Sequence, residues 1–210
     1  MGFNINELLS KDRFSINIFW LHNKSIFTKV TLSMIFACLT GLFAQIRLYL
    51  PWTPIPITLQ SLAVFGSGIF LGSWFGGLSQ ILYILYGLMG IPWFAGRNAG
   101  VSVLLGPSGG YIIGFIFASF FIGKIVEKFK EQNKATLLIS SQIFISNYII
   151  IYGLGLTQLY QWYYFVEGTK LSLIVLLSKG AFPFIVGDLI KIGVSILLLA
   201  RCMLMEYKGE

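Results

Sequence analysis

Two charged side chains lie three residues apart in an apolar stretch near the end of the chain. The stretch reads FPFIVGDLIK, and its charged members are Asp188 and Lys191. On a helix this spacing places both side chains on one face, where they can pair or reach a common ligand. A carboxylate accepts hydrogen bonds from N–H groups, whereas an ammonium group donates them to oxygen. The two residues therefore predict a polar binding site within an apolar part of the protein.

Two structural roles are the alternatives for this pair. The ion pair can serve only to hold its helix against a neighbour, or Lys191 can extend its side chain outward to a membrane surface. A charge at the centre of a membrane-spanning helix costs about 2.5–3.5 kcal/mol on insertion scales, and such residues usually face an internal cavity. We therefore favour a role in binding.

A second candidate for binding lies in the glycine-rich segment 90–111, where Arg97 and Asn98 occur in the sequence AGRNAG. Glycine permits a close approach of the backbone to a ligand. An arginine binds a carboxylate through two parallel hydrogen bonds. The segment predicts a contact to an anionic group, with a solvated loop arginine as the alternative.

Other polar residues fall within predicted apolar helices. Gln60 and Tyr83 can line the same cavity as Asp188, or they can form hydrogen bonds between helices. Ser33, Ala37 and Gly41 repeat at four-residue spacing, which lets two helices approach closely. That second pattern is compatible with packing inside the helical bundle and with a docking face for a partner protein.

Several kinds of chemistry are not expected from this sequence. The segment GRNAGVSVLLGPSGG lacks the GK[ST] ending of a nucleotide-binding P-loop. The sequence contains no His/Cys/carboxylate cluster typical of a metal site and no Ser–His or Cys–His pair typical of a nucleophile. We therefore expect neither an enzyme nor a resident cofactor, and any ATPase activity should belong to another subunit.

The composition identifies the class of protein that holds these residues. Of the 210 residues, 56% are hydrophobic and only 11% are charged, whereas soluble domains carry about 25% charged residues. The mean hydropathy is +0.80. These values predict a multi-pass membrane protein. The net charge of +7 is then expected to reflect basic loops against anionic lipid rather than binding of nucleic acid.

Six segments have the length and composition of membrane-spanning helices, because a bilayer core needs about 20 mostly apolar residues per helix. An all-α membrane domain is therefore predicted over residues 27–205. A basic cytoplasmic or interfacial tail is predicted over residues 1–26, and a short cytoplasmic tail over residues 206–210. The six predicted spans are residues 27–49, 57–73, 74–90, 109–126, 136–159 and 182–204.

The basic residues indicate the orientation of these spans. Of the 15 Lys and Arg residues, ten lie in segments on the side of the two termini, four lie in the opposite loops, and Lys191 lies inside the last span. Basic loops stay on the cytoplasmic side of a membrane. Both termini are therefore predicted to be cytoplasmic.

Three segments together resemble the BioY family of biotin transporters, the substrate-binding S components of energy-coupling factor (ECF) transporters. They are PWTPIPITLQSLAVF, GLMGIPWFAGRNAGVSVLLGPSGGYIIGF and FPFIVGDLIK, and the likeness runs from about Ala37 to Arg201. The resemblance implies six helices in a bacterial cytoplasmic membrane and a vitamin pocket on the outer side. It also implies assembly with a transmembrane coupling protein and two cytoplasmic ATPases, although some members work without the ATPases.

The resemblance also implies roles for individual residues. Asp188, Lys191 and Arg97 would bind biotin, and small residues of the first helix would contact the coupling protein. Asp188 would accept from the ureido N–H, while Lys191 would donate to the ureido oxygen or keep Asp188 ionised. Arg97 would hold the carboxylate, and aromatic side chains such as Tyr83 and Trp93 would pack on the rings. Alternatives are an S component for another vitamin and a structural membrane protein.

Overall fold

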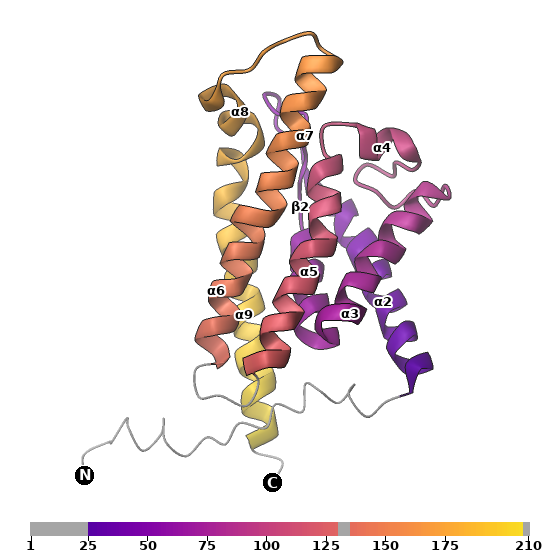
Figure 1. The fold of residues 1–210 in the computed structure, drawn as a ribbon, viewed down its shortest axis with the longest axis vertical. Coiled ribbons are helices and arrows are strands. Elements are labelled where there is room, and N and C mark those ends of the chain that lie inside the picture. The colour runs from indigo at the N-terminus through magenta and orange to yellow at the C-terminus, as the bar shows by residue number, and fades with distance from the viewer. Residues whose placement is uncertain (1–24, 130–134, 208–210) are drawn as a thin grey trace, which may run out of the picture.

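The structure, a computed structural model, describes residues 25–129 and 135–207. Helices make up nearly all of it, and Figure 1 shows them side by side in an elongated bundle. The elements in chain order are α2 (Ile26–Gln45), β1 (Arg47–Leu48), β2 (Ile57–Thr58), α3 (Gln60–Leu88), α4 (Val101–Leu105), α5 (Gly109–Phe129), α6 (Ala135–Ile145), the π-helix η2 (Ser146–Ile151), α7 (Tyr152–Phe165), α8 (Leu173–Gly180), the 3-10 helix η3 (Phe182–Phe184) and α9 (Ile185–Tyr207).

Five helical runs among the described residues are long and apolar enough to cross a membrane. The longest single helix, α3, contains two spans, because its backbone leaves the helical conformation at Gly72 (φ 76°, ψ −171°). The two arms run antiparallel, since the Gln60 amide near the start of α3 donates to the hydroxyl of Tyr83 near its end at 2.7 Å. The prediction of six membrane-spanning helices is therefore confirmed.

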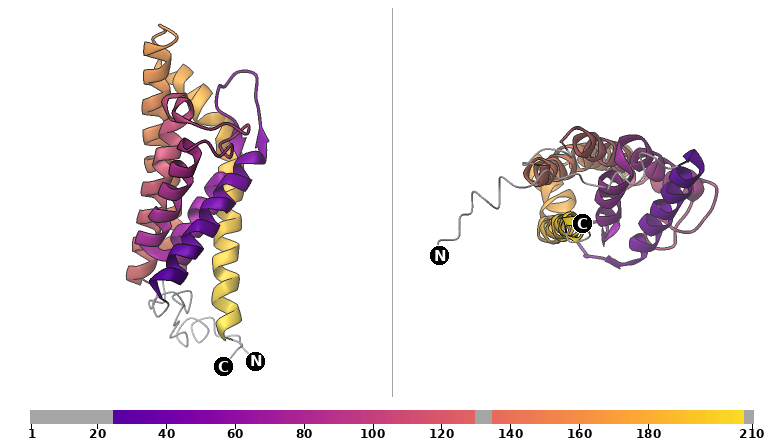
Figure 2. Two further views of the ribbon diagram at one scale, coloured as in Figure 1. Left: turned by 90° about the vertical axis from the view of Figure 1, so that its right-hand side faces the viewer. Right: turned by 90° about the horizontal axis from the view of Figure 1, so that it is seen from below.

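The first arm of α3 is the shortest of the six spans. Its 12 residues from Gln60 to Leu71 extend about 18 Å at 1.5 Å per residue, against a hydrocarbon core of about 30 Å. The proline-rich connection 46–59 precedes this arm, and its strands β1 and β2 pair antiparallel. Figure 2 shows this connection running between α2 and α9. The second span thus begins at Gln60 rather than at Ile57, because residues 57–58 are extended.

The α3 hairpin is held against α5 at its turn. The backbone N–H and the hydroxyl of Ser73 donate to the two carboxylate oxygens of Glu127, each at 2.7 Å. A Cβ atom added to Gly123 would clash with the backbone of Gly72 and Ser73, so α5 approaches the turn closely. Glycines at these two positions therefore let the hairpin and α5 pack together.

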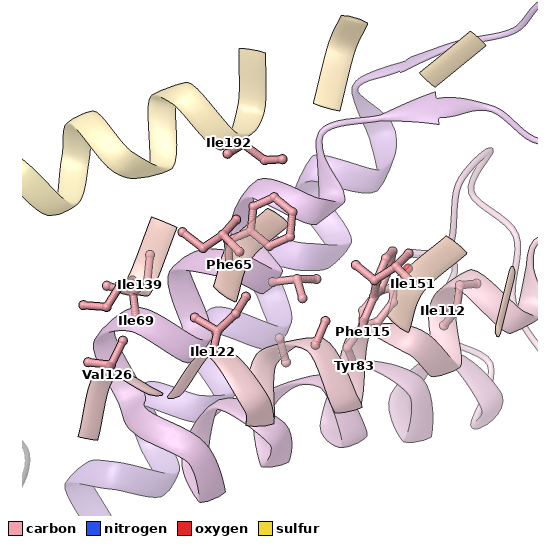
Figure 3. Close-up of a cluster of buried hydrophobic side chains, with 14 of the residues drawn as sticks. Phe65, Ile69, Tyr83, Ile112, Phe115, Ile122, Val126, Ile139, Ile151 and Ile192 are labelled. Carbon is pink, nitrogen blue, oxygen red and sulfur yellow. The ribbon is translucent and has the colours of Figure 1, made fainter. Parts of the chain in front are cut away.

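The hydrophobic core lies between α3, α5, α6 and α9. Figure 3 shows Phe65 and Ile69 of α3 beside Ile122 of α5, Ile139 of α6 and Ile192 of α9. Each of these side chains is at most 2% exposed. Many other apolar side chains, such as those of α2 and α9 that point away from the bundle, are exposed, as expected for surfaces that face lipid.

The connections between helices gather at two ends of the bundle. The connections 46–59, 89–108 and 166–172 lie at one end, here named the loop end, together with α4 and α8 (Figure 1). The beginning of α2, the turn of α3 and the end of α9 lie at the opposite end. The predicted tails, residues 1–26 and 206–210, lie almost entirely outside the described residues, so their assignment stays a prediction.

The turn of α3 yields a prediction for Gly72→Ala. An alanine strains a backbone with φ of 76° and places a methyl group against Glu127, so the free energy of unfolding should fall by about 1–3 kcal/mol. Thermal melting of the detergent-purified protein measures the loss. Gly153→Ala is the matched control, because a Cβ atom there meets no atom within 4 Å. Equal melting temperatures for the two variants would contradict the strained turn.

Candidate functional site

A cavity of about 400 Å³ lies toward the loop end, between α3, α5, η2, α7 and α9. The connection 46–59 and the segment 95–108 complete its wall. Apolar side chains from several of these elements line it, including Ile112, Phe115 and Phe184, together with a small number of polar groups. A mostly apolar cavity of this size with a few convergent polar groups is typical of a small-molecule site.

Asp188 and Lys191 both line this cavity and are only 5% and 6% exposed. Their side chains form an ion pair, with Lys191 Nζ at 2.5 Å from Asp188 Oδ1. Lys191 Nζ also donates to the backbone oxygen of Thr58 at 3.1 Å. The first turn of α9 is therefore tied to the extended chain that leads into α3.

The second carboxylate oxygen of Asp188 accepts two further hydrogen bonds. Asn147 Nδ2 donates to Oδ2 at 3.0 Å, and the Tyr152 hydroxyl donates to the same atom at 2.5 Å. Both donors line the cavity. A buried carboxylate is stable only where it is paired and hydrogen-bonded, and these three partners meet that requirement.

The π-helix η2 explains how two residues five positions apart reach one carboxylate. A π-helical turn forms i→i+5 hydrogen bonds, so Asn147 and Tyr152 lie one above the other on the same face. In a regular α-helix, with 3.6 residues per turn, they would point in different directions. Sequence reasoning missed both residues because it assumed regular helical periodicity, and a polar Asn within an apolar span was the available signal.

Gln60 lines the cavity, but its amide already has two partners within the protein. Its Nε2 atom donates to Tyr83, and its Oε1 atom accepts from the hydroxyl of Thr58 at 3.0 Å. Tyr83 is fully buried and does not line the cavity. Trp93 lies behind it, with its ring centroid 5.4 Å from that of Tyr83 and its Nε1 donating to the Tyr83 backbone oxygen. Tyr83 and Trp93 thus form a packing layer that does not line the cavity, while their contact with the rings of a ligand stays a prediction.

Arg97 and Asn98 lie at the loop end and differ in their relation to the cavity. Asn98 lines it, whereas Arg97 is exposed and does not. Arg97 has a left-handed backbone conformation (φ 59°), and its N–H donates to Gln45 Oε1 at 3.2 Å. The amide nitrogen of Gln45 donates to the backbone oxygens of Trp93 and Phe94. The end of α2 therefore fixes the segment that carries Arg97, while the predicted role of its side chain stays a prediction.

The loop end is also closed by contacts between the connection 46–59 and α8. The Thr53 hydroxyl donates to the backbone oxygen of Lys179 at 2.6 Å. In return, Lys179 Nζ donates to the backbone oxygen of Trp52 at 3.2 Å. These two hydrogen bonds join the connection 46–59 to α8 at the loop end.

The small residues of α2 face the interior of the bundle. Ser33 and Ala37 are at most 1% exposed, and the Ser33 hydroxyl donates to the backbone oxygen of Phe75 at 3.0 Å. A Cβ atom on Gly41 would lie 2.9 Å from the ring of Trp93. This face packs on α3 and on the segment after it, as in the first of the two alternatives for this pattern, while contact of these three residues with a partner protein stays a prediction.

Comparisons with known proteins identify related sequences. A sequence model described as the BioY family matches residues 15–206. A probable biotin transporter BioY of Methanothermobacter thermautotrophicus is 41% identical over 60% of this chain and 80% of its own length. The biotin transporter BioY of Thermotoga maritima is 37% identical over 76% of this chain and 87% of its own length.

A solved structure has the same arrangement of helices. It is the S-component for biotin from an ECF-type ABC transporter, and it superimposes with a TM-score of 0.72 at 26% sequence identity. The likeness covers 83% of this chain and 89% of the other chain.

The hydrogen bonds of Asp188 yield a prediction for Tyr152→Phe. This change removes one donor to a buried carboxylate, so the free energy of unfolding should fall by about 1.5–3 kcal/mol. The melting temperature in detergent should drop by several degrees. Tyr148→Phe is the control, because the Tyr148 ring stacks on that of Tyr152 while its hydroxyl has no partner. A comparable drop in both variants would argue against the hydrogen bond to Asp188.

Proposed function

Because this chain belongs to the BioY family, we propose that it binds biotin outside the cell and serves as the S component of an ECF-type transporter. The observation that carries the proposal is the buried Asp188 carboxylate, held by Lys191 and Asn147 in the wall of a mostly apolar cavity. The protein is then a transport subunit rather than an enzyme. Biotin is its transported substrate, and no cofactor takes part.

The donors and acceptors of the cavity suit the ureido head of biotin. Oδ1 of Asp188 accepts one hydrogen bond, from Lys191, and a carboxylate oxygen can accept two. A ureido N–H can therefore donate to this atom. The rings and the four-carbon tail would pack against Ile112, Phe115 and Phe184, where burial of apolar surface favours binding.

Lys191 is proposed to keep Asp188 ionised. Its ammonium group contacts the carboxylate at 2.5 Å and the backbone oxygen of Thr58 at 3.1 Å, so two of its three protons are engaged. This supports the second of the two roles that the sequence left open for Lys191, which is to keep Asp188 ionised. The third proton remains able to reach a ligand oxygen.

The carboxylate of biotin is proposed to lie toward the loop end, near Asn98 and Arg97. Asn98 Nδ2 donates to the backbone oxygen of Ala95 at 2.8 Å, and its side chain lines the cavity. Arg97 directly precedes Asn98 in the chain and is exposed. A charged group is least costly to bind where it stays closest to water.

The basic residues of the opposite end support a bacterial cytoplasmic membrane location with that end inside. Lys29, Lys124 and Lys128 lie on α2 and α5 at this end, and basic residues are retained on the cytoplasmic side. The membrane domain 27–205 would bind biotin between a basic tail, 1–26, and a short cytoplasmic tail, 206–210. A transmembrane coupling protein and two cytoplasmic ATPases are the proposed partners.

Mass spectrometry of the ligand released from the detergent-purified protein tests the proposed substrate. Biotin should copurify, or labelled biotin should bind to the protein and be displaced by unlabelled biotin. Release of a different vitamin would assign the cavity to that vitamin. A protein that binds no small molecule would instead support a structural role for the Asp188–Lys191 pair.

Asp188→Asn should weaken biotin binding by at least about a hundredfold. The change leaves Lys191 as an unpaired buried cation, and loss of one partner of a buried pair costs about 3–5 kcal/mol. Equilibrium binding of labelled biotin measures the effect. Glu127→Gln is the matched control, because it is the same acid-to-amide change at the opposite end of the bundle. Wild-type affinity in Asp188→Asn would remove Asp188 from the site.

Arg97→Gln should weaken binding of biotin by about tenfold and leave binding of biotin methyl ester unchanged. The ester lacks the negative charge that the guanidinium group would pair with. Competition of each compound against labelled biotin provides the measurement. Arg47→Gln is the control, because Arg47 also lies at the loop end, contacts Gln45 and does not line the cavity. An equal loss for both compounds would exclude a contact between Arg97 and the carboxylate.

A further inference from the structure

The hydroxyl of Ser61 is buried in the cavity wall without a hydrogen-bond partner. Among the described residues, two buried side-chain polar atoms lack a partner, Ser61 Oγ and the Tyr148 hydroxyl. Of these two residues, Ser61 alone lines the cavity, and it is 7% exposed. Buried polar groups in proteins are almost always hydrogen-bonded, and an unpaired hydroxyl that lines a cavity can find its partner on a bound ligand.

Other helical serines of this protein use their own backbone as a partner. Ser67, Ser79 and Ser195 each donate to a backbone oxygen three or four residues earlier, at 2.6–2.9 Å. The corresponding oxygen for Ser61 is that of Thr58, which instead accepts from Lys191 Nζ. Thr58 lies in an extended segment rather than in a helical turn before Ser61, and the Ser61 hydroxyl has no partner within the protein.

The neighbouring polar groups do not offer Ser61 a partner either. The amide of Gln60 is held by Thr58 and Tyr83. The α3 helix begins at Gln60, whose N–H donates to the Thr58 hydroxyl at 3.4 Å, and its positive N-terminal end adjoins the cavity that Gln60 and Ser61 line. A helix N-terminus favours an electron-rich partner, which here would be an acceptor on a ligand.

We infer that Ser61 Oγ donates a hydrogen bond to the ureido oxygen of biotin and contributes to the choice of substrate. The inference rests on the proposed function. A ureido group that donates its N–H to Asp188 has its carbonyl oxygen next to that N–H. The bond from Lys191 to Thr58 holds the first turn of α3 beside the Asp188–Lys191 pair. A ligand without this oxygen leaves the serine hydroxyl unpaired, and sites built to hydrogen-bond a group discriminate against compounds that lack it.

Ser61→Ala tests the inference through the binding of two compounds to the purified full-length protein. The probes are biotin and desthiobiotin, which keeps the ureido ring but lacks the sulfur atom. Loss of one neutral hydrogen bond should weaken the binding of each compound by about tenfold. Ser61→Thr keeps the hydroxyl and should retain most of the affinity. The matched control is Ser79→Ala on the same helix. Ser79 is buried, its hydroxyl donates a hydrogen bond to the backbone oxygen of Gly76, and it does not line the cavity.

Each other result overturns the inference. Unchanged binding in Ser61→Ala would show that the hydroxyl contacts no ligand atom. A loss with biotin but not with desthiobiotin would place the hydroxyl at the sulfur atom instead of the ureido oxygen. If the wild-type protein binds biotin and Ser61→Ala binds it equally tightly, only this inference fails. If the wild-type protein does not bind biotin, the proposed function fails as well.

Discussion

A carboxylate deep in an apolar bundle needs protein partners on every side, and this requirement organises the site. Asp188 is satisfied by Lys191 of its own helix and by Asn147 and Tyr152 of the neighbouring one. Lys191 in turn holds the extended chain before α3 through Thr58. One buried negative charge therefore connects three parts of the cavity wall. The partners that stabilise the charge also determine which of its lone pairs remains for a ligand.

The backbone departs from regular helix at two places in the wall of the cavity. The backbone is extended before Gln60, and a π-helix interrupts the fifth span at Ser146–Ile151. Backbone groups inside a membrane must be hydrogen-bonded, so irregular segments are tolerated only where protein or a cavity surrounds them. The extended segment supplies the backbone oxygen that Lys191 needs, and the π-helix aligns the two donors to Asp188. In both places the irregularity supplies a partner that a straight helix would not provide.

The sequence predicted the parts of this arrangement that follow from simple periodicity and composition. The six spans were recognisable from apolar length, and the joint between the second and third is the turn at Gly72. The i, i+3 spacing was enough to place Asp188 and Lys191 on one face. The π-helix was not predictable, because its i→i+5 alignment has no pattern in a 3.6-residue period. Ser33, Ala37 and Gly41 were ambiguous, since small residues look the same whether they meet a partner or the next helix of the same chain.

The short arms of α3 have a consequence for the lipid around the protein. The second arm, from Ser73 to Leu88, has 16 residues and extends about 24 Å, and Figure 1 shows it inclined to the long axis of the bundle. Trp74, which is 77% exposed next to the turn, is of the residue type that anchors at the headgroup level. Acyl chains beside this hairpin must therefore be shorter than those beside the 21-residue α5. Deforming the bilayer in this way costs a fraction of a kcal/mol per Å of hydrophobic mismatch. The protein thus has a rim of uneven hydrophobic height, and bilayers of different thickness should stabilise it to different degrees.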